Sequence, residues 1–131
     1  LIDSDYVSGG EVCNLVEVFI NKCENLDEFL DVLKFATIYA KTMTLLNMHW
    51  IGTNRIQQRN RRIGVSLTGI QQFVATNGNN LHILREWLEK GYQRVQHLDT
   101  VYSDWFAVPK SIKTTTVKPS GTVSLLACST S

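Results

Sequence analysis

The residues best suited to chemistry gather in one stretch near the carboxyl end, TTTVKPSGTVSLLA, from Thr114 to Ala127. A proline and a glycine interrupt a β-prone run there, and an apolar run follows, as at a strand-to-helix junction. Backbone N–H groups at the start of a helix attract anions, and Ser120, Thr122 and Ser124 add hydroxyl donors. The stretch does not match a Walker loop. It predicts either an anion site or a plain hydroxyl-capped helix start.

The cysteines, Cys13, Cys23 and Cys128, are the second group of chemical interest. Cys13 falls in an expected buried strand, where a small apolar filler is a simpler interpretation than a reactive thiol. An odd, widely spread set without C-x-x-C does not predict a disulfide framework, although a Cys13–Cys23 disulfide stays open. The three histidines have no metal-ligand spacing. We expect a reducing, cytoplasmic setting and no metal site.

Composition restricts the class of protein further. The chain has 131 residues, of which 44% are hydrophobic and 19% charged, enough for one domain with a core. A net charge of +1 gives no basic footprint for nucleic acid. No apolar run approaches the roughly 20 residues of a membrane span, and the first ten residues do not resemble a signal peptide. We therefore expect no membrane and no direct nucleic-acid partner.

Hydrophobic periodicity predicts strands alternating with helices, an α/β fold with few short buried strands and mostly helical by residue count. Asn25 and Glu28 form an expected capping box at one helix start. The expected elements are a strand over Glu11–Ile20, a helix over 26–50, a strand or tight crossing over Ile63–Gly69, a short helix over 70–75, a long helix over 81–105, a β-prone segment over 111–117 and a final helix after Gly121.

Two further segments have competing interpretations. The arginines of TNRIQQRNRR, from Thr53 to Arg62, could bind nucleic acid, but without interleaved aromatics a solvated helix face is favoured. The apolar stripe from Leu81 to Trp105 predicts a packing seam, with Gly91 allowing close approach of a neighbour.

Three stretches in this order, EVCNLVEVF, RNRRIGVSLTGIQQF and TTVKPSGTVSLLA, resemble the catalytic α/β barrel of ribonucleotide reductases. The chain is most similar to the adenosylcobalamin-dependent (class II) ribonucleoside-triphosphate reductases, with the metal-subunit-dependent class I as the alternative. The resemblance implies that residues 1–131 are a single segment of a larger catalytic barrel. It also implies adenosylcobalamin as cofactor, although no residue here is identified as its contact.

The resemblance implies roles for particular residues. Cys13 matches one of two redox-active cysteines that reduce the substrate, and a thioredoxin-like protein would restore them. The segment that matches the family's substrate phosphate-binding loop comprises Pro119, Ser120, Gly121, Thr122, Val123 and Ser124. Its ligand would be a ribonucleoside triphosphate. The arginines before Ile63 match a family signature without a catalytic role, and would form structural ion pairs or face solvent.

The chain also departs from the family pattern. The Asn-Pro-Cys-Gly-Glu motif that carries the radical cysteine is absent, and Cys128 stands where the family usually has glycine. Neither Cys23 nor Cys128 inherits a role. We therefore expect the remainder of a reductase chain as partner, and no turnover by this chain alone. Two competing hypotheses are a stand-alone nucleotide- or phosphate-binding module and a helical interaction domain built on the seam from Leu81 to Trp105.

Overall fold

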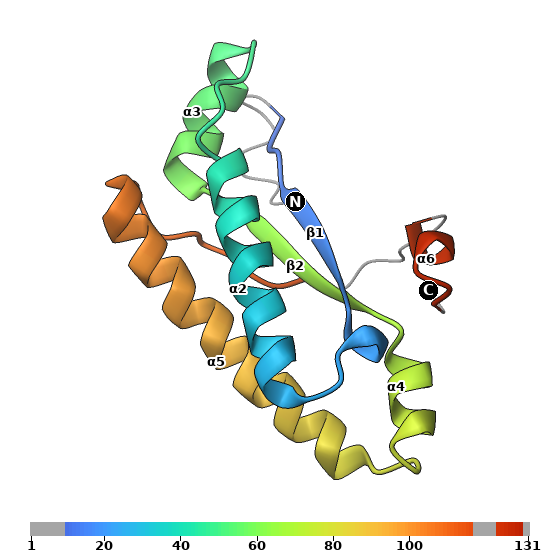
Figure 1. Ribbon diagram of the computed structural model, residues 1–131. Helices are drawn as coiled ribbons and strands as arrows, with labels where there is room; N and C mark the ends of the chain where they lie inside the picture. Colours follow the sequence, from blue (N-terminus) through green and yellow to red (C-terminus); the bar gives the residue numbers. More distant parts are fainter. Residues whose placement is uncertain (1–9, 117–122, 130–131) are drawn as a thin grey trace.

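The computed structural model describes residues 10–116 and 123–129 (Figure 1). Its elements are β1 (Asn14–Phe19), the 3-10 turn η1 (Ile20–Lys22), α2 (Leu26–Met43), α3 (Ile51–Asn60), β2 (Ile63–Thr68), α4 (Ile70–Thr76), α5 (Leu81–Phe106) and α6 (Val123–Leu126). The predicted mixture of long helices and short strands is confirmed, and the described part of the chain is mostly helical.

Strands β1 and β2 are parallel neighbours, with Asn14 opposite Ile63 and Phe19 opposite Thr68. A third segment runs along the other side of β2, where Thr115 forms an isolated parallel bridge with Val65. Parallel strands require crossover connections, which α2 and α3 supply between β1 and β2. The β-prone segment predicted before Val117 is thus confirmed in its described part, as one bridge rather than a full strand.

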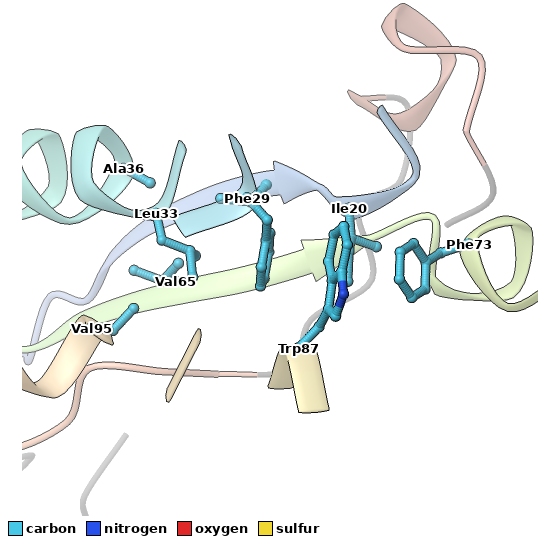
Figure 2. Close-up of a cluster of buried hydrophobic side chains, with 9 residues drawn as sticks. Ile20, Phe29, Leu33, Ala36, Val65, Phe73, Trp87 and Val95 are labelled. Atoms are coloured by element: carbon cyan, nitrogen blue, oxygen red, sulfur yellow. The ribbon is translucent and has the colours of Figure 1, made fainter. Parts of the chain in front are cut away.

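The core lies between the sheet, α2 and α5, which pack on the same face (Figures 1 and 2). Phe29 and Trp87 stack with ring centroids 5.2 Å apart, and Phe73 of α4 closes the cluster against Trp87 at 4.6 Å. Gly91 is buried where α5 crosses α2, and a Cβ atom there would lie 3.0 Å from Leu33 Cδ1. The predicted close approach at Gly91 is therefore confirmed.

The amino end of α2 follows the predicted capping pattern. Asn25 Oδ1 accepts the backbone N–H of Glu28 at 2.8 Å, and the Glu28 carboxylate accepts the N–H of Glu24. The predicted carboxyl end at residue 50 is wrong, because α2 ends at Met43. Thr44 Oγ1 donates to the carbonyl of Lys41 at 2.6 Å, and this local bond helps the chain leave the helix.

One other boundary differs from expectation, and the packing of the long helix differs as well. The first strand begins at Asn14 instead of Glu11, because its partner β2 begins only at Ile63, after the left-handed Arg61 that ends α3. The long helix has the predicted extent, but only its middle packs on α2. Leu81 and Trp105, at the ends of the predicted seam, are 65% and 70% exposed. No helix in the described ranges is long and apolar enough to cross a membrane.

Candidate functional site

The face of the sheet that lies away from α2 and α5 carries the candidate site. Val16 and Val18 of β1 point into the core, so the alternation of a strand sends Leu15 and Glu17 to the opposite face. Gly64 of β2 lies on that same face, since a Cβ atom on it would meet the Leu15 side chain at 2.6 Å. The helices therefore cover one face, and the other carries the side chains of interest.

Cys13 lies one residue before β1, at its amino end, and its thiol is partly exposed and free. The prediction that Cys13 sits within a buried strand is corrected accordingly. Partial burial raises the pKa of the Cys13 thiol above its ordinary value of 9.0, the positive charge of Arg62 lowers it, and the carboxylate of Glu11 raises it further. Burial therefore disfavours the thiolate of Cys13, while two neighbouring charges of opposite sign modify its ionisation.

Those two charges form a buried ion pair beside Cys13. Arg62 Nε lies 2.7 Å from Glu11 Oε1, and the Asn60 amide donates to the same oxygen at 2.9 Å. Arg62 is 7% exposed. The prediction that Arg62 lies on a solvated helix face is therefore wrong, whereas the prediction that it forms a structural ion pair is confirmed.

Arg61 is buried as well, and it ends α3 in the left-handed conformation, with φ of 47°. Its Nη1 donates to the carbonyl of Thr44 and its Nε to that of Gln58 at 2.9 Å. The same burial lowers the pKa of the Arg61 guanidinium from its ordinary value. Arg55 and Arg59 are exposed, as the solvated-face prediction requires. The four arginines therefore divide into two solvent-facing and two structural side chains.

The predicted phosphate segment is described only in part. Pro119, Ser120, Gly121 and Thr122 lie outside the described residues. Val123 and Ser124 begin α6, and Ser124 is 4% exposed. The predicted helix start is confirmed at Val123, but α6 is only four residues long. One turn adds little helix dipole, so the anion interpretation depends on the family resemblance.

The segment that precedes the predicted phosphate loop, from Thr114 to Thr116, pairs with β2 through backbone hydrogen bonds. The backbone N–H of Val65 donates to the carbonyl of Thr114 at 3.0 Å, and the N–H of Thr116 donates to the carbonyl of Val65 at 3.3 Å. Both β1 and this segment therefore run parallel to β2. In parallel sheets, ligands bind beyond the carboxyl ends of the strands, and the predicted phosphate segment follows Thr116 in the sequence.

Asn21 organises the carboxyl ends of the strands, a role that sequence reasoning missed. Its amide donates to Gln72 of α4 at 3.0 Å, and its oxygen accepts the Ser129 hydroxyl at 3.0 Å. Gly69 passes beside it with φ of 83°, a left-handed backbone in which a Cβ atom would collide with the Asn21 side chain. An Asn just after a strand and a Gly just after the next one are the only local signals.

Cys13 and the chain after α6 occupy opposite ends of β1. Cys13 precedes Asn14, whereas Gln72 and Asn21, which contact Cys128 and Ser129, follow the far ends of the strands. A six-residue strand is about 20 Å long. The described residues do not place Cys13 beside Ser124, and a joint site for both remains a prediction.

The described pockets do not fit a corrinoid cofactor. The larger, about 440 Å³, lies on the helix side of β2 and is lined mainly by apolar side chains such as Phe29, Leu88 and Val95. A cavity of this size and character suits a small apolar ligand. Within the described ranges, no group of His, Cys, Asp or Glu side chains could hold a metal ion. No residue of this chain is assigned to adenosylcobalamin.

Comparisons with known proteins identify the class. No family model matches the chain. It is 52% identical over 120 residues to a probable adenosylcobalamin-dependent ribonucleoside-triphosphate reductase of Dictyostelium discoideum, and 50% identical to the enzyme of that name from Euglena gracilis. Each alignment covers 92% of this chain and 16% of the relative. The chain thus spans about a sixth of the length of these curated relatives.

The fold agrees. A crystal structure of a B12-dependent (class II) ribonucleotide reductase superposes with a TM-score of 0.84 at 32% identity, covering 93% of this chain and 20% of that one. The α/β elements described above therefore match part of the class II ribonucleotide reductase fold. Over the aligned residues, the chain belongs to the adenosylcobalamin-dependent ribonucleotide reductase family.

Proposed function

We propose that this chain acts as part of an adenosylcobalamin-dependent ribonucleoside-triphosphate reductase, which converts ribonucleotides to 2′-deoxyribonucleotides. The support is its identity of 50% or more to two reductases of that name, over 92% of its length. The remainder of the reductase would supply the radical-bearing cysteine and the second redox cysteine. Neither competing hypothesis, a stand-alone phosphate module or a helical interaction domain, is favoured by any described contact.

Cys13 is the proposed electron donor of this segment. In the balanced reaction, two cysteine thiols lose two electrons and two protons and form one disulfide. The ribose 2′-hydroxyl leaves as water, and a hydrogen takes its place on the carbon. The observation that supports Cys13 is its position: a free, partly exposed thiol at the start of β1, at the edge of the sheet face that the helices leave uncovered.

The substrate phosphates are assigned to the segment from Pro119 to Ser124. Its support is the match to the family loop, together with its place after a chain segment that runs parallel to β2. Hydroxyl groups and backbone N–H groups are suitable donors to phosphate oxygens. We infer that this segment binds a ribonucleoside triphosphate.

Adenosylcobalamin, when bound to the reductase, would supply the radical chemistry, and its contacts would come from other parts of the enzyme. A thioredoxin-like dithiol protein is the proposed reductant, because the disulfide must be reduced after each turnover. The proposed location is the cytoplasm, where thiols are kept reduced. The three cysteines are free in this structure, which is compatible with that setting.

The test replaces the aligned segment of the Dictyostelium reductase with this chain. We expect the chimaera to form deoxynucleotide from a ribonucleoside triphosphate with adenosylcobalamin and a thioredoxin system. Cys13→Ser should abolish multiple turnover. Cys23→Ser is the matched control, since Cys23 is also a partly buried thiol but has no proposed role. A Cys13→Ser chimaera with normal turnover would contradict the assignment.

A further inference from the structure

The strand register places an arginine beside the Cys13 thiol. Asn14 pairs with Ile63 and Leu15 with Gly64, so the next position back sets Cys13 against Arg62. The backbone N–H of Asn14 donates to the carbonyl of Arg62 at 3.3 Å, which continues the ladder to this point. Neighbouring parallel strands lie about 4.8 Å apart, close enough for the two side chains to interact.

The Arg62 guanidinium is held in place but not fully used. Its Nε donates to Glu11 at 2.7 Å, and the side chain is about nine-tenths buried. Its Nη2 is buried and has no hydrogen-bond partner in the described part of the chain. A buried donor without a partner is costly, and such groups in native structures usually have a reason. A negatively charged group beside Arg62 would give its Nη2 an electrostatic partner.

We propose that Arg62 is a positioning residue for the redox chemistry, in which its guanidinium, held by Glu11, stabilises the thiolate of Cys13. This inference rests on the proposed function of Cys13. Cys13 becomes a thiolate when its disulfide is reduced. The attacking thiolate of the dithiol reductant forms a new S–S bond with the partner sulfur, the old S–S bond breaks, and its electron pair goes to Cys13. A positive charge beside that sulfur makes it a better leaving group.

Other charged groups near Cys13 also shift the pKa of its thiol. Glu11 opposes Arg62, since its carboxylate raises the pKa of the Cys13 thiol, while burial is the largest influence. Glu17 lies on the same sheet face further along β1. The terminal ammonium group belongs to residues outside the described ranges, and it is the same in all variants compared below.

The test measures alkylation of Cys13 across pH, in a Cys23→Ser, Cys128→Ser background. The midpoint of the rate profile reports thiol ionisation, and its plateau at high pH reports access. Arg62→Gln and Glu11→Gln break the same ion pair but remove opposite charges. We expect Arg62→Gln to move the midpoint upward and to slow alkylation at pH 7 by about threefold or more. Glu11→Gln should move it downward.

Matched controls separate charge from structure. Arg62→Lys keeps the charge and should largely restore the midpoint, whereas Arg55→Gln removes an exposed arginine and should leave it unchanged. If Arg62→Gln does not fold, Glu11→Gln and Arg62→Lys decide the question. Midpoints that move in the same direction for both ion-pair variants, or that do not move, overturn the inference. Turnover of the chimaera is not involved, so the proposed function can fail or hold independently.

Discussion

Lys41 Nζ of α2 lies 2.9 Å from Asp99 Oδ1 of α5, and both side chains are almost completely buried. The ammonium group also donates to the carbonyl of Pro109 and to Ser111 Oγ, and the Asp99 carboxylate accepts the Ser111 N–H at 3.0 Å. This ion pair and its hydrogen bonds thus join α2 and α5 to the segment from Pro109 to Ser111. That segment continues to Thr115, which forms the parallel bridge with β2. The ion pair therefore positions the residues that lead to the proposed phosphate loop.

Removing the lysine should be strongly destabilising. In Lys41→Met, Asp99 keeps a buried charge without its cation, which costs about 3–5 kcal/mol in comparable sites. Urea unfolding followed by circular dichroism measures the loss. Lys90→Met is the matched control, because its pair with Glu86 is half exposed and should contribute less than about 1 kcal/mol. Equal losses for the two variants would contradict the buried role of Lys41.

Substitutions at two glycines with left-handed backbone can test whether the packing of Asn21 against Gly69 stabilises the fold. Gly69 and Gly78 both have positive φ, but only Gly69 packs against Asn21, and Gly78 has open space around it. Gly78→Ala should cost about 1 kcal/mol from backbone strain alone. Gly69→Ala should cost more, because Asn21 must also move and release its contacts with Gln72 and Ser129. Thermal unfolding of both variants tests this order, and a smaller loss at Gly69 would contradict it.

The buried hydrophobic cluster of Figure 2, which includes Phe29, Phe73 and Trp87, should dominate the stability of the core. Phe73 is 3% exposed and its ring lies 4.6 Å from that of Trp87. Phe73→Ala should therefore cost about 3–5 kcal/mol by leaving a cavity. Phe35→Ala, at a position 67% exposed, should change stability by less than about 0.5 kcal/mol. Denaturant midpoints measure both, and a neutral Phe73→Ala would show that α4 does not close the core.

Tyr102 should make the fold sensitive to alkaline pH. Burial raises the pKa of its hydroxyl above the ordinary 10.0, although the nearby Arg94 lowers it. The folded state therefore keeps this proton at pH values where the unfolded state has lost it. The resulting stability is fully present below pH 10 and is lost as the pH rises through the raised pKa.

Tyr102→Phe removes this dependence. The free energy of unfolding should fall less steeply above pH 10 in Tyr102→Phe than in the wild type, measured by urea titrations at several pH values. The thiols of Cys13 and Cys23 also have raised pKa values, but they are common to both proteins and cancel in the difference. Tyr39→Phe removes an exposed hydroxyl as a control. Parallel pH profiles for wild type and Tyr102→Phe would refute the prediction.

Local signals in the sequence predicted most of the elements and their order. The Asn25 cap, the short apolar segment from Ile63 and the apolar spacing along α5 act within a few residues, so they can be recognised without the fold. The family resemblance added the proposed roles of Cys13 and the phosphate segment. Boundaries were less predictable: α2 ends at Met43, earlier than its apolar pattern suggested, and Thr44 forms a local hydrogen bond at that point.

The placement of charges was decided by tertiary structure. In sequence, Arg61, Arg62 and Lys41 look like solvent-facing residues, because a charged side chain is normally exposed. The ion-pair partners of two of them are remote: Arg62 pairs with Glu11 across 51 positions, and Lys41 with Asp99 across 58. Composition and periodicity carry no information about such pairs. The sequence by itself determined the elements and the family, whereas only the parallel pairing of β1 with β2 brought Arg62 beside Cys13.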